Sequence, residues 1–233
     1  MVNGAYFPEF SAGGLQCQAV ARILHDRASV VVLTTATDST LRRHDTVEGV
    51  GVSRITVTQN GGWSALRATI KMLIELVRLL PMVDLVHIQG FSSKNIPISA
   101  TAKLFGRPVV LHLQTAKHDE PAAVKAQGRL AWWAFQSADL YLSVSPGLTK
   151  PCLDAGMAAE RFREVPNGVD ASRFSPASPD ERRALRTRLD LPVDRPLILF
   201  VGVISPDKQP HVLLDAWLLT QHDPALASTL VFV

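Results

Sequence analysis

Short apolar runs rich in β-branched residues alternate along the chain with stretches whose apolar residues recur every three to four positions. The runs predict strands that are covered on both faces, as in a parallel sheet. An opening strand is expected to end within residues 2–6. The other strands are expected at residues 30–35, 52–58, 85–88, 108–113, 140–145, 197–203 and 229–233.

Helical periods fill the intervals between these runs. We expect helices after the glycine pair Gly13-Gly14 and at residues 63–80, 94–105, 122–137, 146–155, 179–189 and 211–221. This alternation of strands and helices predicts doubly wound α/β units with right-handed crossovers.

Two of these helices have a readable inner face. In the first helix, the inner positions are expected to be Leu15, Ala19, Val20, Ile23 and Leu24. In helix 63–80, they are expected to be Leu66, Ile70, Leu73, Ile74, Val77 and Leu80. The opposite, solvent-facing side of that helix is expected to carry Arg67, Lys71, Glu75 and Arg78.

A cluster of prolines and turn residues between Pro166 and Pro196 predicts a domain boundary. We place a first Rossmann-like domain at residues 1–172, and a linker with a second, incomplete domain at residues 173–233. The second domain reaches only one strand–helix–strand unit before Val233, so we expect it to be truncated after its first β-α-β unit.

Composition narrows the classes of function. Of the 233 residues, 47% are hydrophobic and 19% charged, which suffices for a sizeable core. The net charge of +3 permits an anionic small molecule or a membrane surface as a partner. Nucleic acid is disfavoured, because no basic run is interleaved with aromatic residues. With only Cys17 and Cys152, a disulfide framework or thiolate metal site is not expected, and a reducing cytoplasm fits.

The pair Gly13-Gly14 stands at a junction between a strand and a helix. Paired glycines let the backbone approach a ligand closely, and a helix start offers free N–H groups to a phosphate or sugar hydroxyl. The alternative is a turn that only caps the helix. The pair is neither a Gly-x-Gly-x-x-Gly nor a Walker motif, which disfavours a dinucleotide-dependent oxidoreductase. Hydrolase elbows and zinc motifs are also absent from the sequence.

Polar side chains follow several predicted strands. In an open α/β sheet, ligands bind outside the carboxyl ends of the strands, so these residues are expected to share one rim. Each histidine taken alone is more often a structural residue. The rim residues are His87, Gln89, His112, Gln114, Ser143 and Ser145.

Two sets of cations are candidate binding groups. Lys208 follows a buried-type strand in the loop Gly202-x-x-x-Pro206-Asp207-Lys208, where a lysine can meet a diphosphate or simply be solvated. The residues Arg67, Lys71 and Arg78 form a basic stripe that is suited to anionic lipid headgroups. Because Glu75 interrupts the stripe, a solvated helix face is the favoured interpretation.

Taken in order, these landmarks resemble the GT-B glycosyltransferases of the large retaining family 4. The resemblance covers nearly the whole chain. Its pieces are Tyr6-Phe7-Pro8-Glu9 with Gly13-Gly14, Val83 to Gly90, Gly106 to Leu111, Ser137-Ala138-Asp139 to Ser145, Val165-Pro166-Asn167-Gly168-Val169-Asp170 with Phe174, and Leu199-Phe200-Val201-Gly202 with Lys208.

The resemblance implies two Rossmann-like domains that face each other across a cleft. The first domain would hold a glycan, lipid-linked or small-molecule acceptor, and the second a nucleotide-sugar donor. Gly13, Gly14 and Lys208 would bind the donor phosphates, and His112 would be catalytic. His87, Gln89, Gln114, Ser145 and Asn167 would lie on the acceptor side. No metal or cofactor is expected, and the location would be cytoplasmic, with peripheral contact to the inner face of the membrane as an option.

The sequence also departs from the family pattern. Val203 stands where the family usually has an arginine that binds the diphosphate, Gln209 where it often has glycine, and Gln114 where many members have a histidine. The family's paired glutamates would lie beyond Val233, so we expect this chain to be inactive alone. The alternative function is that of a non-catalytic remnant or carbohydrate-binding module on the same fold.

Overall fold

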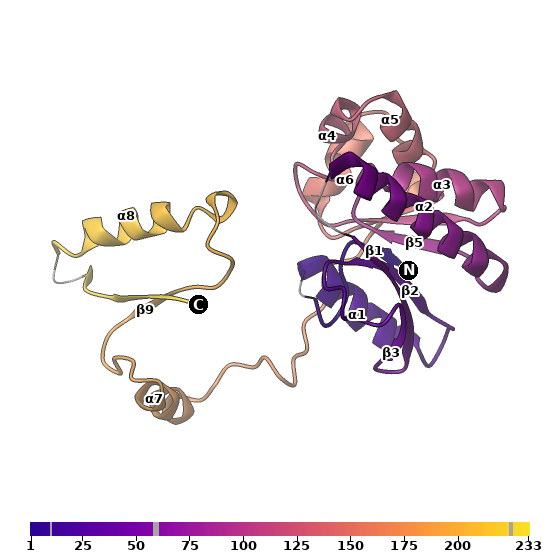
Figure 1. The fold of residues 1–233 in the computed structure, drawn as a ribbon. Coiled ribbons are helices and arrows are strands. Elements are labelled where there is room, and N and C mark those ends of the chain that lie inside the picture. The colour runs from indigo at the N-terminus through magenta and orange to yellow at the C-terminus, as the bar shows by residue number, and fades with distance from the viewer. Residues whose placement is uncertain (10, 58–60, 224–225) are drawn as a thin grey trace. The chain divides into compact units, whose positions relative to one another are not determined.

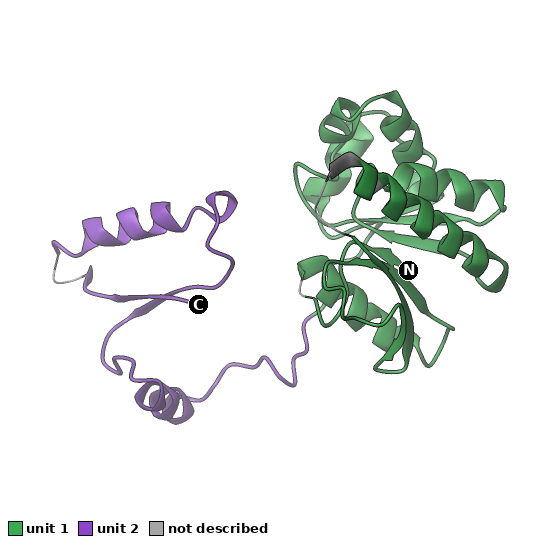
Figure 2. Ribbon diagram, in the orientation of Figure 1, with its two compact units in different colours: residues 1–168 green, residues 169–233 purple. Residues whose placement is uncertain are grey.

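The computed structural model describes residues 1–9, 11–57, 61–223 and 226–233. It divides into two compact units, Met1–Gly168 (unit 1) and Val169–Val233 (unit 2), as Figure 2 shows. The sequence predicted the division after Ser172.

Unit 1 contains an eight-stranded sheet in the order β3-β4-β2-β1-β5-β6-β7-β8, parallel throughout except for the antiparallel β3 (Figure 1). The expected doubly wound α/β class is therefore confirmed. The strands are β1 (Val2–Asn3), β2 (Val31–Ala36), β3 (His44–Val47), β4 (Val50–Thr56), β5 (Val86–Gln89), β6 (Val109–Leu113), β7 (Leu140–Ser143) and β8 (Phe162–Glu164). Sequence patterns missed β3 and β8. Thr58, the last residue of the strand predicted at 52–58, lies outside the described residues.

The helices of unit 1 connect these strands. They are α1 (Ala12–Leu24), α2 (Gly61–Leu79), α3 (Asn95–Leu104), α4 (Pro121–Ala126), α5 (Arg129–Gln136) and α6 (Pro146–Asp154), with short 3₁₀ turns at Leu80–Met82 and Ala159–Arg161. Neighbouring residues of β2 belong to different hydrophobic clusters, Leu33 to the larger and Val32 to the smaller. Since successive side chains of a strand point to opposite faces, the sheet is buried on both faces.

The single helix predicted at residues 122–137 is wrong, because the chain breaks it into α4 and α5 at Gly128. This glycine has a φ of +107°, a conformation that other residues rarely adopt. Its carbonyl then accepts a hydrogen bond from the backbone N–H of Trp132 at 3.1 Å, so the same residue begins α5.

The predicted inner faces of α1 and α2 are wrong at most positions, although Leu80 is fully buried and Leu73 packs against the core as predicted. In α1 the buried residues are Gly14, Cys17 and Ala21, whereas Leu15 and Ile23 are exposed. In α2 the buried side includes Ala68, Met72, Glu75 and Leu76. The residues of α2 that were predicted to face inward but are exposed are Leu66, Ile70, Ile74 and Val77. The buried residues recur at helical spacing as well, so two apolar stripes existed in the sequence and periodicity chose the wrong one.

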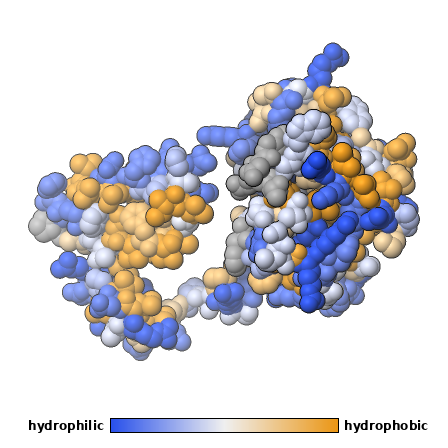
Figure 3. Space-filling model, viewed as in Figure 1, coloured by the Kyte–Doolittle hydropathy of each residue, from blue (hydrophilic) through white to orange (hydrophobic). Residues whose placement is uncertain are grey.

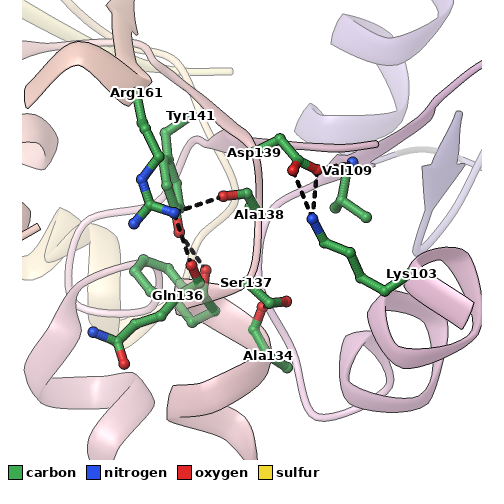
Figure 4. A network of polar contacts seen from close by, with 10 residues as sticks. Lys103, Val109, Ala134, Gln136, Ser137, Ala138, Asp139, Tyr141 and Arg161 are labelled. Atoms are coloured by element: carbon green, nitrogen blue, oxygen red, sulfur yellow. Dashed lines mark hydrogen bonds and ion pairs between the residues drawn. The ribbon is translucent and has the colours of Figure 1, made fainter. Parts of the chain in front are cut away.

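The Ser137-Ala138-Asp139 motif has a structural explanation at the start of β7 (Figure 4). The carboxylate of Asp139 accepts a hydrogen bond from the backbone N–H of Val109 at 2.7 Å and pairs with the ammonium of Lys103 at 2.6 Å. On the other side of the motif, the guanidinium of Arg161 donates to the carbonyls of Gln136 and Ala138, both at 3.1 Å. These bonds join α3, β6 and the end of α5 to β7.

Unit 2 contains α7 (Pro179–Arg188), β9 (Leu197–Phe200), a 3₁₀ turn (Pro206–Lys208), α8 (Pro210–Thr220) and β10 (Thr229–Phe232). Strands β9 and β10 are parallel, with Leu197 opposite Thr229, so the expected β-α-β unit is present. The predicted strand to Val203 ends earlier, at Phe200. Among the described residues of unit 2, only Ser228 is buried.

Candidate functional site

Unit 1 has a pocket where the strand order reverses, between β1 and β5. Sequential neighbours of β1 run outward on one side through β2 and β4, and those of β5 run outward on the other through β6 and β7. Ligands of open α/β sheets bind at this switch point, outside the carboxyl ends of the strands. The pocket has a volume of about 420 Å³, and its lining residues include Asn3, Gly13, Met72, Gln89, Gly90, Lys94, Asn95, Gln114, Thr115, His118 and Asp119.

Two glutamine amides from adjacent strands meet at the pocket. The Nε2 of Gln114, just after β6, donates to the Oε1 of Gln89 at the end of β5. The Oε1 of Gln114 lies on the side of Gly13, where a Cβ on that glycine would come within 3.2 Å of it. Asn3 adds a third amide, whose Nδ2 donates to the carbonyl of Ala5 at 2.8 Å. Amides offer both donors and acceptors, which suits a ligand rich in hydroxyl groups.

The two glycines of the predicted pair have different surroundings. Gly13 lines the pocket, so its lack of a side chain keeps the pocket open. Gly14 is buried, and a Cβ there would lie 2.6 Å from the carbonyl oxygen of Ala5. Its backbone N–H donates to the hydroxyl of Ser11, the N-cap residue of α1, at 2.9 Å. Gly14 is therefore required for close packing, while Gly13 belongs to the pocket.

A buried carboxylate holds the loops around the pocket. Asp119 accepts hydrogen bonds from three backbone N–H groups, those of Phe91 at 2.7 Å, Gln114 at 2.7 Å and Thr115 at 2.9 Å. It therefore ties the segment after β5 to the segment after β6. Gly90, the first residue after β5, has a φ of +70°. Its carbonyl accepts from the Nδ2 of Asn95 at 2.8 Å.

Two histidines lie beneath the glutamines, each two residues before a glutamine and therefore on the same side of its strand. The rings of His87 and His112 are stacked with their centroids 5.7 Å apart. The Nε2 of His87 lies 3.4 Å from the Nε2 of Gln89, and the Nδ1 of His112 lies 3.4 Å from the Nε2 of Gln114. Gln114 lines the pocket and His112 does not, so His112 reaches the pocket only through Gln114.

Burial keeps both imidazoles neutral. It lowers the pKa of His87 to about 3, with a smaller contribution from neighbouring His112. Burial also lowers the pKa of His112, and nearby Asp119 opposes that change. A neutral ring nitrogen without a hydrogen accepts from an amide NH₂ group, so the two histidines orient the two glutamine amides. The Nε2 of His112 has no hydrogen-bond partner among the described residues.

A family model described as "Glycosyl transferase 4-like domain" matches residues 13–168. The chain belongs to this family. The match begins at Gly13, so it includes the pocket residues from that glycine onward, and it ends at the last residue of unit 1.

Curated relatives of this family member include D-inositol 3-phosphate glycosyltransferases. The protein from Nocardiopsis dassonvillei is 44% identical over 162 residues, which covers 64% of this chain and 36% of that protein. The protein from Salinispora tropica is 48% identical over 77 residues, 31% of this chain and 16% of that protein. The alignments thus span well under two thirds of the length of these relatives.

Solved GT-B glycosyltransferases share the fold at low sequence identity. HepE from Anabaena, in complex with UDP and glucose, superposes with a TM-score of 0.70 at 21% identity, covering 99% of this chain and 59% of HepE. WaaG, a glycosyltransferase involved in lipopolysaccharide biosynthesis, gives 0.65 at 16% identity, covering all of this chain and 68% of WaaG.

Only some of the predicted site residues lie at the pocket of unit 1. Gln89, Gln114 and Gly13 line one pocket, with His87 and His112 beneath it. Ser145 instead begins α6, and its carbonyl accepts from the hydroxyl of Ser143 at 2.8 Å. Asn167 is exposed near the end of unit 1, and neither residue lines the pocket. Lys208 and Val203 are exposed in unit 2.

Sequence reasoning missed several residues of the pocket. Asn3, Lys94, Asn95, His118 and Asp119 all line it. Asn3 ends β1 and was readable by the strand-end rule that selected Gln89 and Gln114. The signal for Asp119 was weaker, because it lies in a loop and joins the nearby Gln114 and Thr115 to Phe91, which is 28 residues away along the chain. No cluster of three or more potential metal ligands, and no helix able to cross a membrane, occurs within the described part of the chain.

Proposed function

We propose that this protein acts as a nucleotide-sugar-dependent glycosyltransferase that transfers a sugar, with retention, to a hydroxyl group of an acceptor held in the switch-point pocket of unit 1. Membership of the family, the names of the curated relatives and the UDP complex of HepE all support this class of reaction. Cys17 and Cys152 are unpaired and buried thiols, which suits the cytoplasmic location that the sequence predicted.

The pocket's polar lining is the observation on which the acceptor assignment depends. Three side-chain amides, from Asn3, Gln89 and Gln114, present donors and acceptors at one opening. A sugar or polyol has the same mixture of donors and acceptors on each hydroxyl. Lys94 and His118 add cationic or polar groups for one anionic substituent. The acceptor class we propose is therefore a polyol or sugar, with D-inositol 3-phosphate as the first candidate to test.

The proposed reaction also needs groups that stabilise the departing nucleoside diphosphate. Departure of a nucleoside diphosphate places negative charge on the leaving group, which cations and backbone donors stabilise. In this proposal, Lys208 is a cation of this kind, and no metal or other cofactor takes part. His112 is a positioning residue, because it contacts Gln114 and not the pocket.

Acceptor binding is the first test. Isothermal titration calorimetry of the purified chain should detect binding of D-inositol 3-phosphate or of another compound from a panel of sugars and polyols. The Gln114→Ala variant should bind it about 5- to 30-fold more weakly, since one or two hydrogen bonds are lost. The exposed Gln127 at the end of α4 supplies the control, because Gln127→Ala makes the same chemical change away from the pocket. Equal affinities of both variants would contradict the assignment.

Transfer is the second test. The same protein is incubated with UDP-, GDP- and ADP-sugars and a bound acceptor, and the released nucleoside diphosphate is measured. Release that depends on the acceptor supports the proposed reaction and would overturn the expectation that this chain is inactive alone. Acceptor binding without release from any donor would favour the alternative, a carbohydrate-binding module. Val203, a neutral residue where the family usually carries an arginine, is the observation in favour of that alternative.

A further inference from the structure

The pocket wall beside Gly13 differs from the outer surface of unit 1. That surface mixes hydrophobic and hydrophilic residues, as Figure 3 shows for one face. Beside Gly13 the wall carries two side-chain oxygens, because a Cβ on that glycine would lie 3.2 Å from Oε1 of Gln114 and 3.7 Å from Oδ1 of Asn3. Since both oxygens lie within 4 Å of one point, a single ligand can contact both.

Hydrogen bonds fix which end of the Asn3 amide lies next to Gly13. The Nδ2 of Asn3 donates to the carbonyl of Ala5 at 2.8 Å, and its Oδ1 accepts from the backbone N–H of Gly4 at 2.7 Å. A rotated amide would place oxygen against oxygen and hydrogen against hydrogen, so rotation would lose both bonds. The Oδ1 retains a second lone pair for a ligand.

The side-chain amide of Gln114 has no free hydrogen. One hydrogen of its Nε2 is donated to Oε1 of Gln89, and the other is directed at Nδ1 of His112, 3.4 Å away. The Oε1 of Gln114 accepts from no group that the structure describes. It lies beside Gly13 in the first turn of α1, where unpaired backbone N–H groups carry partial positive charge and favour an oxygen. Gln114 therefore presents only an acceptor to the pocket.

His87 and His112 hold the two glutamine amides in this orientation. If Gln114 alone were rotated, its oxygen would face the oxygen of Gln89, so the two amides must rotate together. A joint rotation would place amide oxygens against Nε2 of His87 and Nδ1 of His112, and both ring nitrogens would then need a hydrogen. Burial lowers the pKa of both rings, so each is neutral and carries one hydrogen. The present arrangement requires that hydrogen on Nδ1 of His87 and on Nε2 of His112.

We propose that this wall selects the acceptor by two neighbouring hydroxyl groups that donate hydrogen bonds, one to Gln114 and one to Asn3. His87 and His112 are then positioning residues that maintain the selection. The inference rests on the proposed function, since it describes how the switch-point pocket recognises its polyol or sugar. A substituent that lacks a hydrogen would meet these oxygens without forming a bond, and buried acceptors left unpaired are costly.

A cation is the competing ligand for two such oxygens. The charges around the pocket disfavour it, because Lys94 lines the same pocket and the positive end of α1 begins beside it. The carboxylate of Asp119 lies there too, but it already accepts three backbone N–H groups. Neutral hydroxyl donors are therefore favoured.

Nuclear magnetic resonance of the histidine rings tests the amide polarity without any ligand. Long-range proton–nitrogen correlation spectra at neutral pH show which ring nitrogen carries the hydrogen, and the His87→Gln and His112→Gln variants assign the signals. We expect the hydrogen on Nδ1 of His87 and on Nε2 of His112. The reverse pair of tautomers would overturn the proposal, because Gln114 would then present its NH₂ group to the pocket.

Binding of fluorinated ligands tests the selection itself. The probes are D-inositol 3-phosphate and its deoxyfluoro derivatives, in each of which fluorine, which cannot donate, replaces one hydroxyl. Calorimetry should show a loss of affinity of roughly 10-fold or more at two neighbouring ring positions, and smaller losses elsewhere. Binding of every derivative within about 2-fold of the unsubstituted compound would overturn the proposal. Absence of binding by any polyol would refute the proposed acceptor, whereas the tautomers report the amide polarity in either case.

Variants of His112 test its role as a positioning residue. His112→Leu removes the ring acceptor and frees Gln114 to rotate, so discrimination between hydroxyl and fluorine should fall from roughly 10-fold to about 2-fold. His112→Asn should retain the discrimination, because an amide oxygen can take the place of Nδ1. The control is His25→Leu, the same change at an exposed histidine away from the pocket. An equal loss of affinity for all compounds in His112→Leu, with discrimination unchanged, would contradict the positioning role.

Discussion

Units 1 and 2 both consist of parallel strands connected by helices, yet they bury their side chains very differently. Unit 1 covers both faces of its sheet, and residues such as Phe135 and Tyr141 are fully buried. In unit 2, β9 and β10 pair through four residues, but Leu199, Val201 and Leu219 remain more than half exposed. Figure 1 shows the contrast between the layered unit 1 and the single strand–helix–strand of unit 2.

The difference teaches that local elements and a core have separate causes. Helix caps, turns and apolar runs are enough to specify α7, α8 and the two strands of unit 2. A core requires two packed layers whose residues come from distant parts of the chain. Two strands supply little surface for such packing. We therefore expect the cooperative stability of the chain to reside in unit 1.

The largest expected difference in stability is between truncating an aromatic residue of unit 1 and truncating one of unit 2. Phe135→Ala should destabilise unit 1 by about 3–5 kcal/mol, because it leaves a cavity among Phe91, Trp132 and Tyr141. Phe174→Ala in unit 2, where the ring is 63% exposed, should change the free energy of unfolding by less than about 0.5 kcal/mol. Urea titration followed by tryptophan fluorescence measures both. Similar losses in the two variants would break the comparison.

Acid should weaken unit 1 through its two buried histidines. Because the pKa of His87 is about 3 in the folded protein, the unfolded chain binds its proton first as the pH falls. The stability that depends on neutral His87 is complete above about pH 6.5 and is lost progressively toward pH 3, by about 2 kcal/mol at pH 5. The lowered pKa of His112 acts in the same direction.

Urea titrations at pH 7 and pH 5 measure this dependence, and comparing the parent with a His87 variant at each pH cancels the titration of other groups. His87→Gln should flatten the dependence. An unchanged pH profile in that variant would mean that His87 does not hold the neutral form.

The two glycines of α1 should separate packing from ligand binding. Gly14→Ala should cost about 1–3 kcal/mol, because the new methyl group meets the carbonyl of Ala5 at 2.6 Å. Gly13→Ala should leave stability unchanged or raise it by up to about 1 kcal/mol through helix propensity. The same variant should weaken acceptor binding, because its methyl group meets Gln114. Thermal unfolding and calorimetric titration distinguish the two, and equal destabilisation by both would contradict the assignment.

The smallest expected effect is local to unit 2. Ser178 caps α7 in a reciprocal capping box with Glu181, whose carboxylate accepts from the Ser178 backbone N–H at 2.9 Å. Ser178→Ala should weaken α7 by about 0.5–2 kcal/mol. Faster amide hydrogen exchange within residues 179–188 is the readout, with Ser175→Ala as the control. Exchange that also accelerates in unit 1 would show that the two units are coupled in stability.

Much of the fold could be predicted from the sequence because parallel sheets bury both faces of each strand. Continuous apolar runs therefore located β2, β5, β6, β7 and β9 to within a few residues. The antiparallel β3 escaped, since its residues His44–Val47 form an edge and alternate in exposure. For the candidate site, strand-end residues gave Gln89 and Gln114. The rule could not separate these from Ser145, which follows β7 and stands at the N-cap position of α6 instead.

By itself, the sequence determined the α/β class, the division into two units and the polar residues at the strand ends, because these depend on short-range periodicity and turn chemistry. Tertiary structure alone decided which of the two stripes of α2 faces the core, that Glu75 is buried in an ion-pair cluster, and that His87 and His112 lie beneath the glutamines. Those outcomes depend on which elements pack together. A helix with two apolar stripes carries no local information about which one its neighbours will cover.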